Sequence, residues 1–207
     1  LPSPANLHMW NITTETKCLL CGKSVCTTAH VLGACKTSLK QGRFTFRHDS
    51  VLHVLVNGLT SFISSLTPAH VQSDRIDFVP EGSLPPRRSQ KQYRGIVQYA
   101  TDWKILCDSE AKTLVIPTCF AVSSRRPDIF IFSLSLKLVI MIELTCPCEE
   151  NMPSWNKIKR VRYLPLCDAI KANGWSVHLF AVEVGARGYC AESVRWCLLQ
   201  LGMSNAA

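Results

Sequence analysis

The sequence is short of acidic residues and contains no long apolar run. Its 207 residues include 15 Asp and Glu against 23 Lys and Arg, which gives a formal net charge of +8 and a pI near 9.0. This basic surplus favours a polyanionic partner, with nucleic acid ahead of a membrane surface. The longest apolar stretch, residues 134–144, is interrupted by Ser135, Lys137 and Glu143. It falls short of the roughly 18 residues that span a bilayer, so we expect no membrane partner.

An export signal and an initiator methionine are also missing. The opening LPSPANLHMW has neither a basic segment nor an apolar one, so we expect an intracellular protein that is not secreted. Since no methionine starts it, we expect the chain to be part of a longer protein. Eleven cysteines, an odd number, argue against a closed disulfide framework and for reduced thiols, some of them on metal. The hydrophobic content of 47% is enough for a core and excludes wholesale disorder.

Hydrophobic periodicity predicts a mixed α/β fold around one central sheet flanked by helices. The predicted helices cover residues 50–65, 154–172 and 192–201, and the predicted strands cover 75–79, 114–116, 128–134, 137–144 and 175–184. The two central strands are separated by Ser135 and Leu136 and should form a tight hairpin.

Several boundaries have local signals. Asp49 or Ser50 is the expected N-cap of the first helix. Pro165 should kink or divide the second helix, and Gly174 should end it. The Pro-rich, basic segment 80–94 reads as a long loop.

Four potential zinc ligands lie near the start of the chain in the pattern C-x2-C-x8-H-x4-C. They are Cys18, Cys21, His30 and Cys35. Tetrahedral zinc is held by two such pairs, each close in sequence, and four protein ligands make a structural site. A module this small has little core, so the metal would supply its folding energy. The alternatives are four unrelated buried residues, or Cys26 in place of one ligand. A redox Cys-x-x-Cys is disfavoured because no thioredoxin-like strand precedes it.

Two acids border the predicted hairpin. Asp128 opens its first strand and Glu143 closes its second, so both should lie near the same end of adjacent strands. Carboxylates brought together repel unless a cation or proton lies between them, and Mg²⁺ prefers such hard oxygen ligands. The alternatives are a turn or strand-end cap for Asp128 and a salt bridge to Lys or Arg for Glu143.

A basic helix follows the second acid. Trp155, Lys159 and Tyr163 recur at helical spacing, so Lys159 is placed to point back toward the carboxylates. A lysine there would orient an attacking water or neutralise a phosphate. The alternative is a solvated basic face, which would still suit a DNA backbone. That face would comprise Lys157, Lys159, Arg160 and Arg162.

These motifs together resemble one family. Pro127-Asp128 followed by Glu143 resembles the PD-(D/E)xK nuclease signature, with Thr145 where the signature has its lysine. The full order is the Cys/His knuckle, GRFTFRHD at 42–49, RPD at 126–128, ELT at 143–145, then Lys159 and Tyr163. This order resembles the restriction-like endonuclease region at the C-terminal end of site-specific and related non-LTR (LINE-type) retrotransposon polyproteins. In that family the basic residue lies on the following helix, which suits Lys159.

The resemblance implies a restriction-endonuclease-like fold and three segments. Residues 1–17 would be a linker from an upstream polymerase region, 18–42 a CCHC zinc knuckle, and 43–207 the endonuclease domain. Asp128 and Glu143 would bind the catalytic Mg²⁺ or Mn²⁺, with Lys159 as third active-site member. His48, in the family's Arg-His motif, and Tyr163 would complete the site.

The implied activity is nicking of double-stranded target DNA in the nucleus. The exposed 3′-hydroxyl would prime an upstream reverse transcriptase domain of the same polyprotein, with element RNA as a further candidate partner. The expected nucleic-acid contacts are Arg47, Arg87, Arg88, Lys91, Arg126, Lys157, Arg160 and Arg162.

Two alternatives keep the fold without the chemistry. One is a catalytically inactive or domesticated nucleic-acid-binding domain. The other is an interaction domain descended from the element, which would show no salt-dependent DNA affinity.

Overall fold

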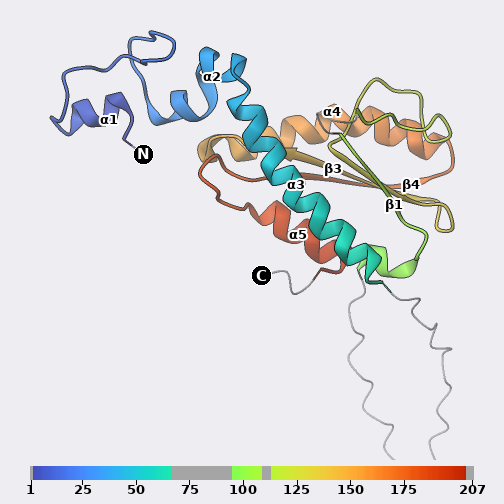
Figure 1. The fold of residues 1–207 in the computed structure, drawn as a ribbon. Coiled ribbons are helices and arrows are strands. Elements are labelled where there is room, and N and C mark those ends of the chain that lie inside the picture. The colour runs from blue at the N-terminus through green and yellow to red at the C-terminus, as the bar shows by residue number, and fades with distance from the viewer. Residues whose placement is uncertain (1, 67–94, 109–112, 204–207) are drawn as a thin grey trace, which may run out of the picture.

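A computed structural model describes residues 2–66, 95–108 and 113–203 (Figure 1). The strands are β1 (Lys104–Cys107), β2 (Ile129–Ser133), β3 (Leu138–Thr145) and β4 (Ser176–Glu183). The α-helices are α1 (Pro4–Met9), α2 (Lys36–Lys40), α3 (Arg43–Ser64), α4 (Met152–Ala172) and α5 (Glu192–Leu201). The short helices are η1 (π, His30–Ala34), η2 (3₁₀, Ile96–Tyr99) and η3 (3₁₀, Glu149–Asn151).

The four strands form one mixed sheet in the order β1-β2-β3-β4. The first three are antiparallel neighbours, and β4 lies parallel to β3. A parallel neighbour needs a long crossover, which α4 supplies. The mixed α/β class is confirmed. None of the helices in the described part of the chain is long and apolar enough to cross a membrane.

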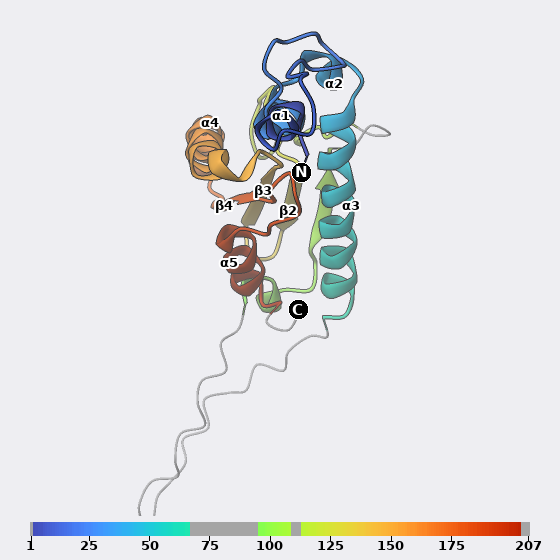
Figure 2. The same ribbon diagram turned by 90° about the vertical axis from the view of Figure 1, so that its left-hand side faces the viewer.

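Helices cover both faces of the sheet, with α4 on one side and α3 and α5 on the other (Figure 2). The strand alternation explains this division, because successive side chains point to opposite faces. In β3, Val139 and Met141 pack in the α4-side core, whereas Ile140 and Ile142 pack in the α3/α5-side core. All four side chains are buried, so β3 is the centre of the molecule.

Most of the predicted elements in the described residues are confirmed. The hairpin forms between β2 and β3 through a turn at Leu134–Lys137. The helix α4 runs undivided through the exposed Pro165, and Gly174 follows its end with a φ of 80°. The strand β4 and the helix α5 lie within one residue of the predicted ranges.

The first long helix was predicted to begin too late. It begins at Arg43, after Gly42 takes a left-handed φ of 70° that separates α2 from α3. The Ser50 hydroxyl donates to the Phe46 carbonyl 2.7 Å away, one turn earlier, so it does not cap a helix end. Asp49 instead contacts His48. The proposed Asp49 or Ser50 cap is therefore wrong.

The predicted strand at 114–116 is also wrong. Leu114 and Ile116 are buried in the α4-side core, but as irregular chain, with the Leu114 amide donating to Asp108 Oδ1 at 2.8 Å. The edge strand is instead β1, which pairs with β2. The predicted strand 75–79 and the loop 80–94 lie outside the described residues.

The first 17 residues, expected to be a linker, include the helix α1. Ser3 caps it, since its side chain accepts from the Asn6 amide. The Ala5 amide donates to the Cys26 carbonyl at 3.1 Å, so α1 lies against the Cys-rich segment. A six-residue helix shows too little periodicity to be predicted from sequence.

Two glycines make a matched test of the packing. A Cβ on Gly95 would overlap the backbone of Gly202, whereas a Cβ on the exposed Gly58 of α3 would meet nothing within 4 Å. We expect Gly95→Ala to lower the free energy of unfolding by about 1–3 kcal/mol through overpacking. We expect Gly58→Ala to raise it by up to about 1 kcal/mol through helix propensity. Denaturant titration measures both, and a shift of both variants in the same direction would contradict the packing described here.

Candidate functional site

The two acids of the hairpin face each other across β2 and β3. Ile129 pairs with Ile142 in the antiparallel register, so the next residues outward, Asp128 and Glu143, lie opposite one another. Alternation puts Glu143 on the same side as Met141, toward α4. The register therefore brings both carboxylates to the same end of the sheet.

Backbone amides hold each carboxylate from the opposite strand. The Asp128 amide donates to Glu143 Oε2 at 3.3 Å, and the Leu144 amide donates to Asp128 Oδ2 at 2.7 Å. These reciprocal hydrogen bonds tie each side chain to the backbone of the opposite strand. The acid pair is consequently a rigid feature of the hairpin end.

The charge of Glu143 is buried and needs compensation. Its side chain is only 3% exposed. Burial, and after it the nearby charge of Asp128, raises the pKa of Glu143, while Lys159 acts in the opposite direction. The Lys159 ammonium, from α4, forms an ion pair with Glu143 Oε1. The helix thus delivers its amine to the acid pair, as the helical spacing predicted.

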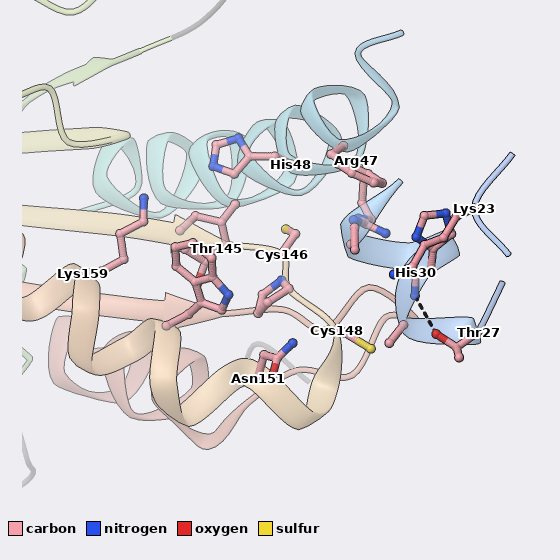
Figure 3. A pocket seen from close by; sticks show the side chains of 17 residues that line it. Lys23, Thr27, His30, Arg47, His48, Thr145, Cys146, Cys148, Asn151 and Lys159 are labelled. Atoms are coloured by element: carbon pink, nitrogen blue, oxygen red, sulfur yellow. Dashed lines mark hydrogen bonds between the residues drawn. The ribbon is translucent and has the colours of Figure 1, made fainter. Parts of the chain in front are cut away.

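His48 lies on α3, whereas Lys159 lies on α4 (Figure 3), and the His48 imidazole contacts Asp128. Its Nε2 lies 3.4 Å from Asp128 Oδ2, and its Nδ1 lies 2.9 Å from Asp49 Oδ1. Burial lowers the pKa of His48, but the contacts with Asp128 and Asp49 outweigh it and raise the pKa to about 9. The imidazole is therefore protonated at neutral pH and adds a positive charge beside Asp128.

Tyr163 lies in the α4-side core, next to the acid pair. Its hydroxyl donates to the Arg126 backbone carbonyl at 2.7 Å. Burial, followed by the charge of Glu143, raises the pKa of Tyr163, so the phenol stays neutral. This bond holds the segment that leads into Asp128.

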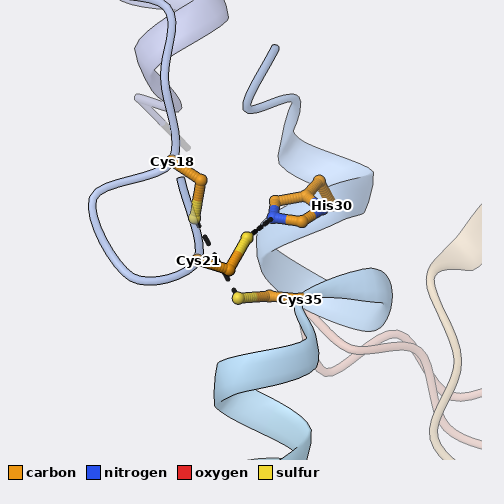
Figure 4. Close-up of side chains that lie close together, drawn as sticks. All are labelled: Cys18, Cys21, His30 and Cys35. Carbon is orange, nitrogen blue, oxygen red and sulfur yellow. Dashed lines mark hydrogen bonds between the residues drawn. The ribbon is translucent and has the colours of Figure 1, made fainter. Parts of the chain in front are cut away.

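The four predicted zinc ligands come together in the N-terminal segment (Figure 4). One ligand atom from each residue lies within 4.8 Å of all the others. Cys18 Sγ and Cys35 Sγ are 4.0 Å apart, and Cys21 Sγ is 3.2 Å from His30 Nε2. The set could bind a metal ion such as zinc. Cys26 is buried beside the cluster but is not a member of the donor set.

Local backbone geometry arranges these donors. Gly22 takes a left-handed φ of 72°, and its amide donates to the Cys18 carbonyl at 2.8 Å, which closes the turn that carries Cys18 and Cys21. His30 begins η1, and Cys35 follows its last residue. A hydrogen bond from the Cys21 backbone, the largest influence, lowers the pKa of Cys18 to about 6. A thiolate is the form that binds metal.

A pocket of about 480 Å³ is lined by His30 of the Cys/His cluster and by residues that contact or neighbour the acid pair (Figure 3). The cluster contributes His30, α3 contributes Arg47 and His48, and α4 contributes Lys159. Arg47 Nη2 donates to the Leu32 carbonyl in η1 at 2.8 Å. This hydrogen bond connects the Cys-rich segment to α3, which packs on the sheet.

The other predicted nucleic-acid contacts are dispersed. The Arg126 side chain is half exposed and lies 3.9 Å from Asp108. Arg162 is exposed and, three residues after Lys159, shares its flank of α4. Lys157 and Arg160 are exposed elsewhere on α4, and Arg160 lies near Glu183. Arg87, Arg88 and Lys91 lie outside the described residues.

Several supporting contacts were not anticipated. Glu183, 3% exposed at the end of β4, accepts bonds from Asn156 Nδ2 at 2.8 Å and Ser193 Oγ at 2.6 Å. It lies beside Thr145 in the parallel register and stabilises the α4–β4 side of the site. The sequence did hold a signal for Glu183, because an acidic residue at the end of a buried strand needs bonding partners. The sequence holds no signal for the Arg47–Leu32 bond, since that bond depends on how two segments pack.

Comparisons of the chain with protein-family models, with curated proteins and with solved structures find no match.

The pairing of His48 with Asp128 gives a pH-dependent prediction. Without added Mg²⁺ or Mn²⁺, the His48 imidazole should titrate near pH 9 by NMR, and Asp128→Asn should lower that pKa by about one unit or more. Because the folded pKa is raised, the contribution to stability is present below the unfolded value of about 6.5 and is lost as pH rises toward 9.

His48→Gln assigns the signal among the six histidines and should remove this pH dependence of the free energy of unfolding. A wild-type His48 that titrates at its ordinary value would contradict the described geometry.

Proposed function

We propose that this chain is a metal-dependent DNA endonuclease with a restriction-endonuclease-like fold, part of a non-LTR retrotransposon polyprotein. It would nick target DNA in the nucleus, and the exposed 3′-hydroxyl would prime reverse transcription. The observation that carries this proposal is the convergence of Asp128, Glu143 and Lys159 at one end of the sheet. The order of sequence motifs supports the same proposal.

The acid pair suits a divalent cation. Asp128 and Glu143 offer hard oxygen donors, and the raised pKa of the buried Glu143 reflects a place where an additional positive charge is favourable. A bound Mg²⁺ or Mn²⁺ would polarise the scissile phosphate and lower the pKa of a coordinated water. The reciprocal amide bonds keep the two carboxylates in place whether or not a cation is bound.

The remaining residues assist the reaction through position and charge. Lys159, whose amine already touches Glu143, would orient the attacking water and neutralise the phosphate. The protonated His48 would balance charge at Asp128. Tyr163 holds the segment before Asp128 and is best described as a positioning residue.

The Cys/His cluster would hold a structural zinc. Four protein donors leave no open position for water, so the ion would stabilise the fold of the segment and take no part in hydrolysis. Because the cluster lies beside the pocket, we infer that this segment also contributes to nucleic-acid binding.

A plasmid-nicking assay tests the hydrolytic site. In Mg²⁺, we expect the wild type to convert supercoiled DNA to the open-circular form. Asp128→Ala and Glu143→Ala should each reduce the rate at least about a hundredfold. Asp168→Ala, which removes an exposed acid on the same helix as Lys159, is the matched control and should leave the rate unchanged.

Nicking that persists in both site variants would refute the assignment. Salt-dependent DNA binding without any nicking by the wild type would favour the inactive nucleic-acid-binding domain instead. Absence of salt-dependent binding would favour an interaction domain.

Elemental analysis tests the zinc. We expect one Zn²⁺ per chain in freshly purified, reduced protein, and loss of that zinc in Cys18→Ala/His30→Ala. Cys119→Ala, which removes an exposed cysteine outside the cluster, is the control and should keep its zinc. Zinc-free wild type would overturn the assignment.

A further inference from the structure

The pocket between the Cys/His cluster and the acid pair has the size of a small-molecule subsite. Its volume of about 480 Å³ lies within the range of roughly 300–1,000 Å³ typical of ligand pockets. Thr145, His48 and Lys159 line it and also lie at or next to the acid pair, so its inner end opens on the proposed reaction centre. Its outer wall is the Cys-rich segment, including Lys23 and His30 (Figure 3).

The lining combines positive charge with aromatic surface. Lys23, Arg47 and Lys159 provide cations, and none of the described residues that line the pocket is acidic. Trp155 from α4 lines it with a 39% exposed indole. A large aromatic side chain left exposed among cations is the composition of sites that stack nucleobases and hold phosphates.

The pocket wall also carries unused polar atoms. Within residues 2–66, 95–108 and 113–203, three buried side-chain atoms lack a hydrogen-bond partner: His30 Nδ1, Arg47 Nε and Thr145 Oγ1. All three belong to residues that line this one pocket. Thr145 is 8% exposed, so its hydroxyl is a nine-tenths buried polar group at the pocket's inner end. Buried polar groups in folded proteins nearly always bond to protein or to ordered water, so these atoms favour polar occupants in this pocket, either water or a polar ligand group.

The walls of the pocket are fixed in place. Arg47 donates to the Leu32 carbonyl and stacks over the Phe44 ring, 5.3 Å from its centroid. The bond to Leu32 ties the outer wall to α3, the Phe44 ring holds the Arg47 side chain against its own helix, and α4 supplies the opposite wall. A preformed pocket costs a ligand little ordering free energy.

From these observations we propose that the pocket holds one unpaired nucleoside of the cleaved DNA strand, next to the scissile phosphate. This inference rests on the proposed endonuclease function and adds a subsite to it. The base would stack on Trp155, and the Asn151 amide at the pocket wall would meet its edge. Arg47 and Lys159 would lie along the flanking phosphates.

The nucleoside must be unpaired, because a base inside a duplex presents no free face for stacking on an indole. Extruding a base costs a few kcal/mol, least where the duplex is mismatched or already open. The pocket would therefore favour DNA that is single-stranded beside the cleavage point over intact duplex.

Binding without cleavage tests the subsite. The probe is a fluorescein-labelled ten-nucleotide oligo(dT), measured by anisotropy with the whole chain in buffer without added Mg²⁺ or Mn²⁺, so that the proposed zinc stays in place. We expect Trp155→Ala to weaken binding about 5- to 150-fold, the range found for loss of one base-stacking contact. Trp155→Phe should restore binding to within about threefold, because phenylalanine also stacks. Binding of the corresponding duplex should change less than twofold.

Two controls separate stacking from charge and from folding. Trp10→Ala removes an exposed indole outside the pocket and should bind like the wild type. An oligonucleotide whose central three nucleotides are abasic should bind the wild type more weakly, and Trp155→Ala should add little further loss. Matching far-UV circular dichroism of all variants shows that they fold.

Three outcomes would overturn the proposal. The first is that Trp155→Ala binds oligo(dT) as tightly as the wild type does. The second is that Trp155→Ala loses as much affinity for the abasic oligonucleotide as for the normal one. The third is that Trp155→Ala loses more affinity for oligo(U) RNA than for oligo(dT), which would assign the pocket to RNA. The nicking assay is independent of this result. Binding that depends on Trp155 without nicking would retain the subsite and remove the nuclease, and nicking without Trp155-dependent binding would do the reverse.

Discussion

The opposition of Asp128 and Glu143 across two antiparallel strands is the constraint on which the site depends. A slip of one residue in the register would turn one carboxylate to the other face of the sheet. The Asp128 and Leu144 amides prevent such a slip at this end, since each pairing forms only in the observed register. The buried side chains along β2 and β3 impose the same register along the strands' length. The register that packs the core is therefore also the register that brings the two acids together.

The parts of this arrangement that sequence could predict are those set by local pattern. The apolar runs on either side of Ser135 and Leu136 predicted the hairpin, and the hairpin predicted that its two terminal acids would meet. Lys159 followed from helical spacing, because α4 is long and regular enough for positions four apart to share a face. The Cys/His donors followed from their spacing in the same way. In each case the residues that meet are close in sequence, or a turn brings two neighbouring segments together.

The parts that failed depend on contacts between distant segments. Leu114 and Ile116 are as buried as strand residues, but packing against α4 rather than sheet pairing buries them. Apolar composition cannot distinguish those two causes. The start of α3 depends on the left-handed Gly42, and the eight polar or aromatic residues that follow it show no clean apolar stripe. The reach of Arg47 to the Leu32 carbonyl lies beyond any pattern, because it requires the fold of both segments to be known.

That bond gives the first turns of α3 a double role. Arg47 holds the Cys-rich segment, and the next residue, His48, contacts Asp128. Adjacent residues of one helix point in directions about 100° apart, so a single rigid turn can touch both neighbours at once. The Cys/His cluster and the acid pair are therefore fixed relative to each other by one helical turn, with the pocket between them. In the proposed endonuclease, a DNA strand bound across that pocket would meet the cluster and the carboxylates at a set separation, which would hold one phosphodiester bond in position for the reaction.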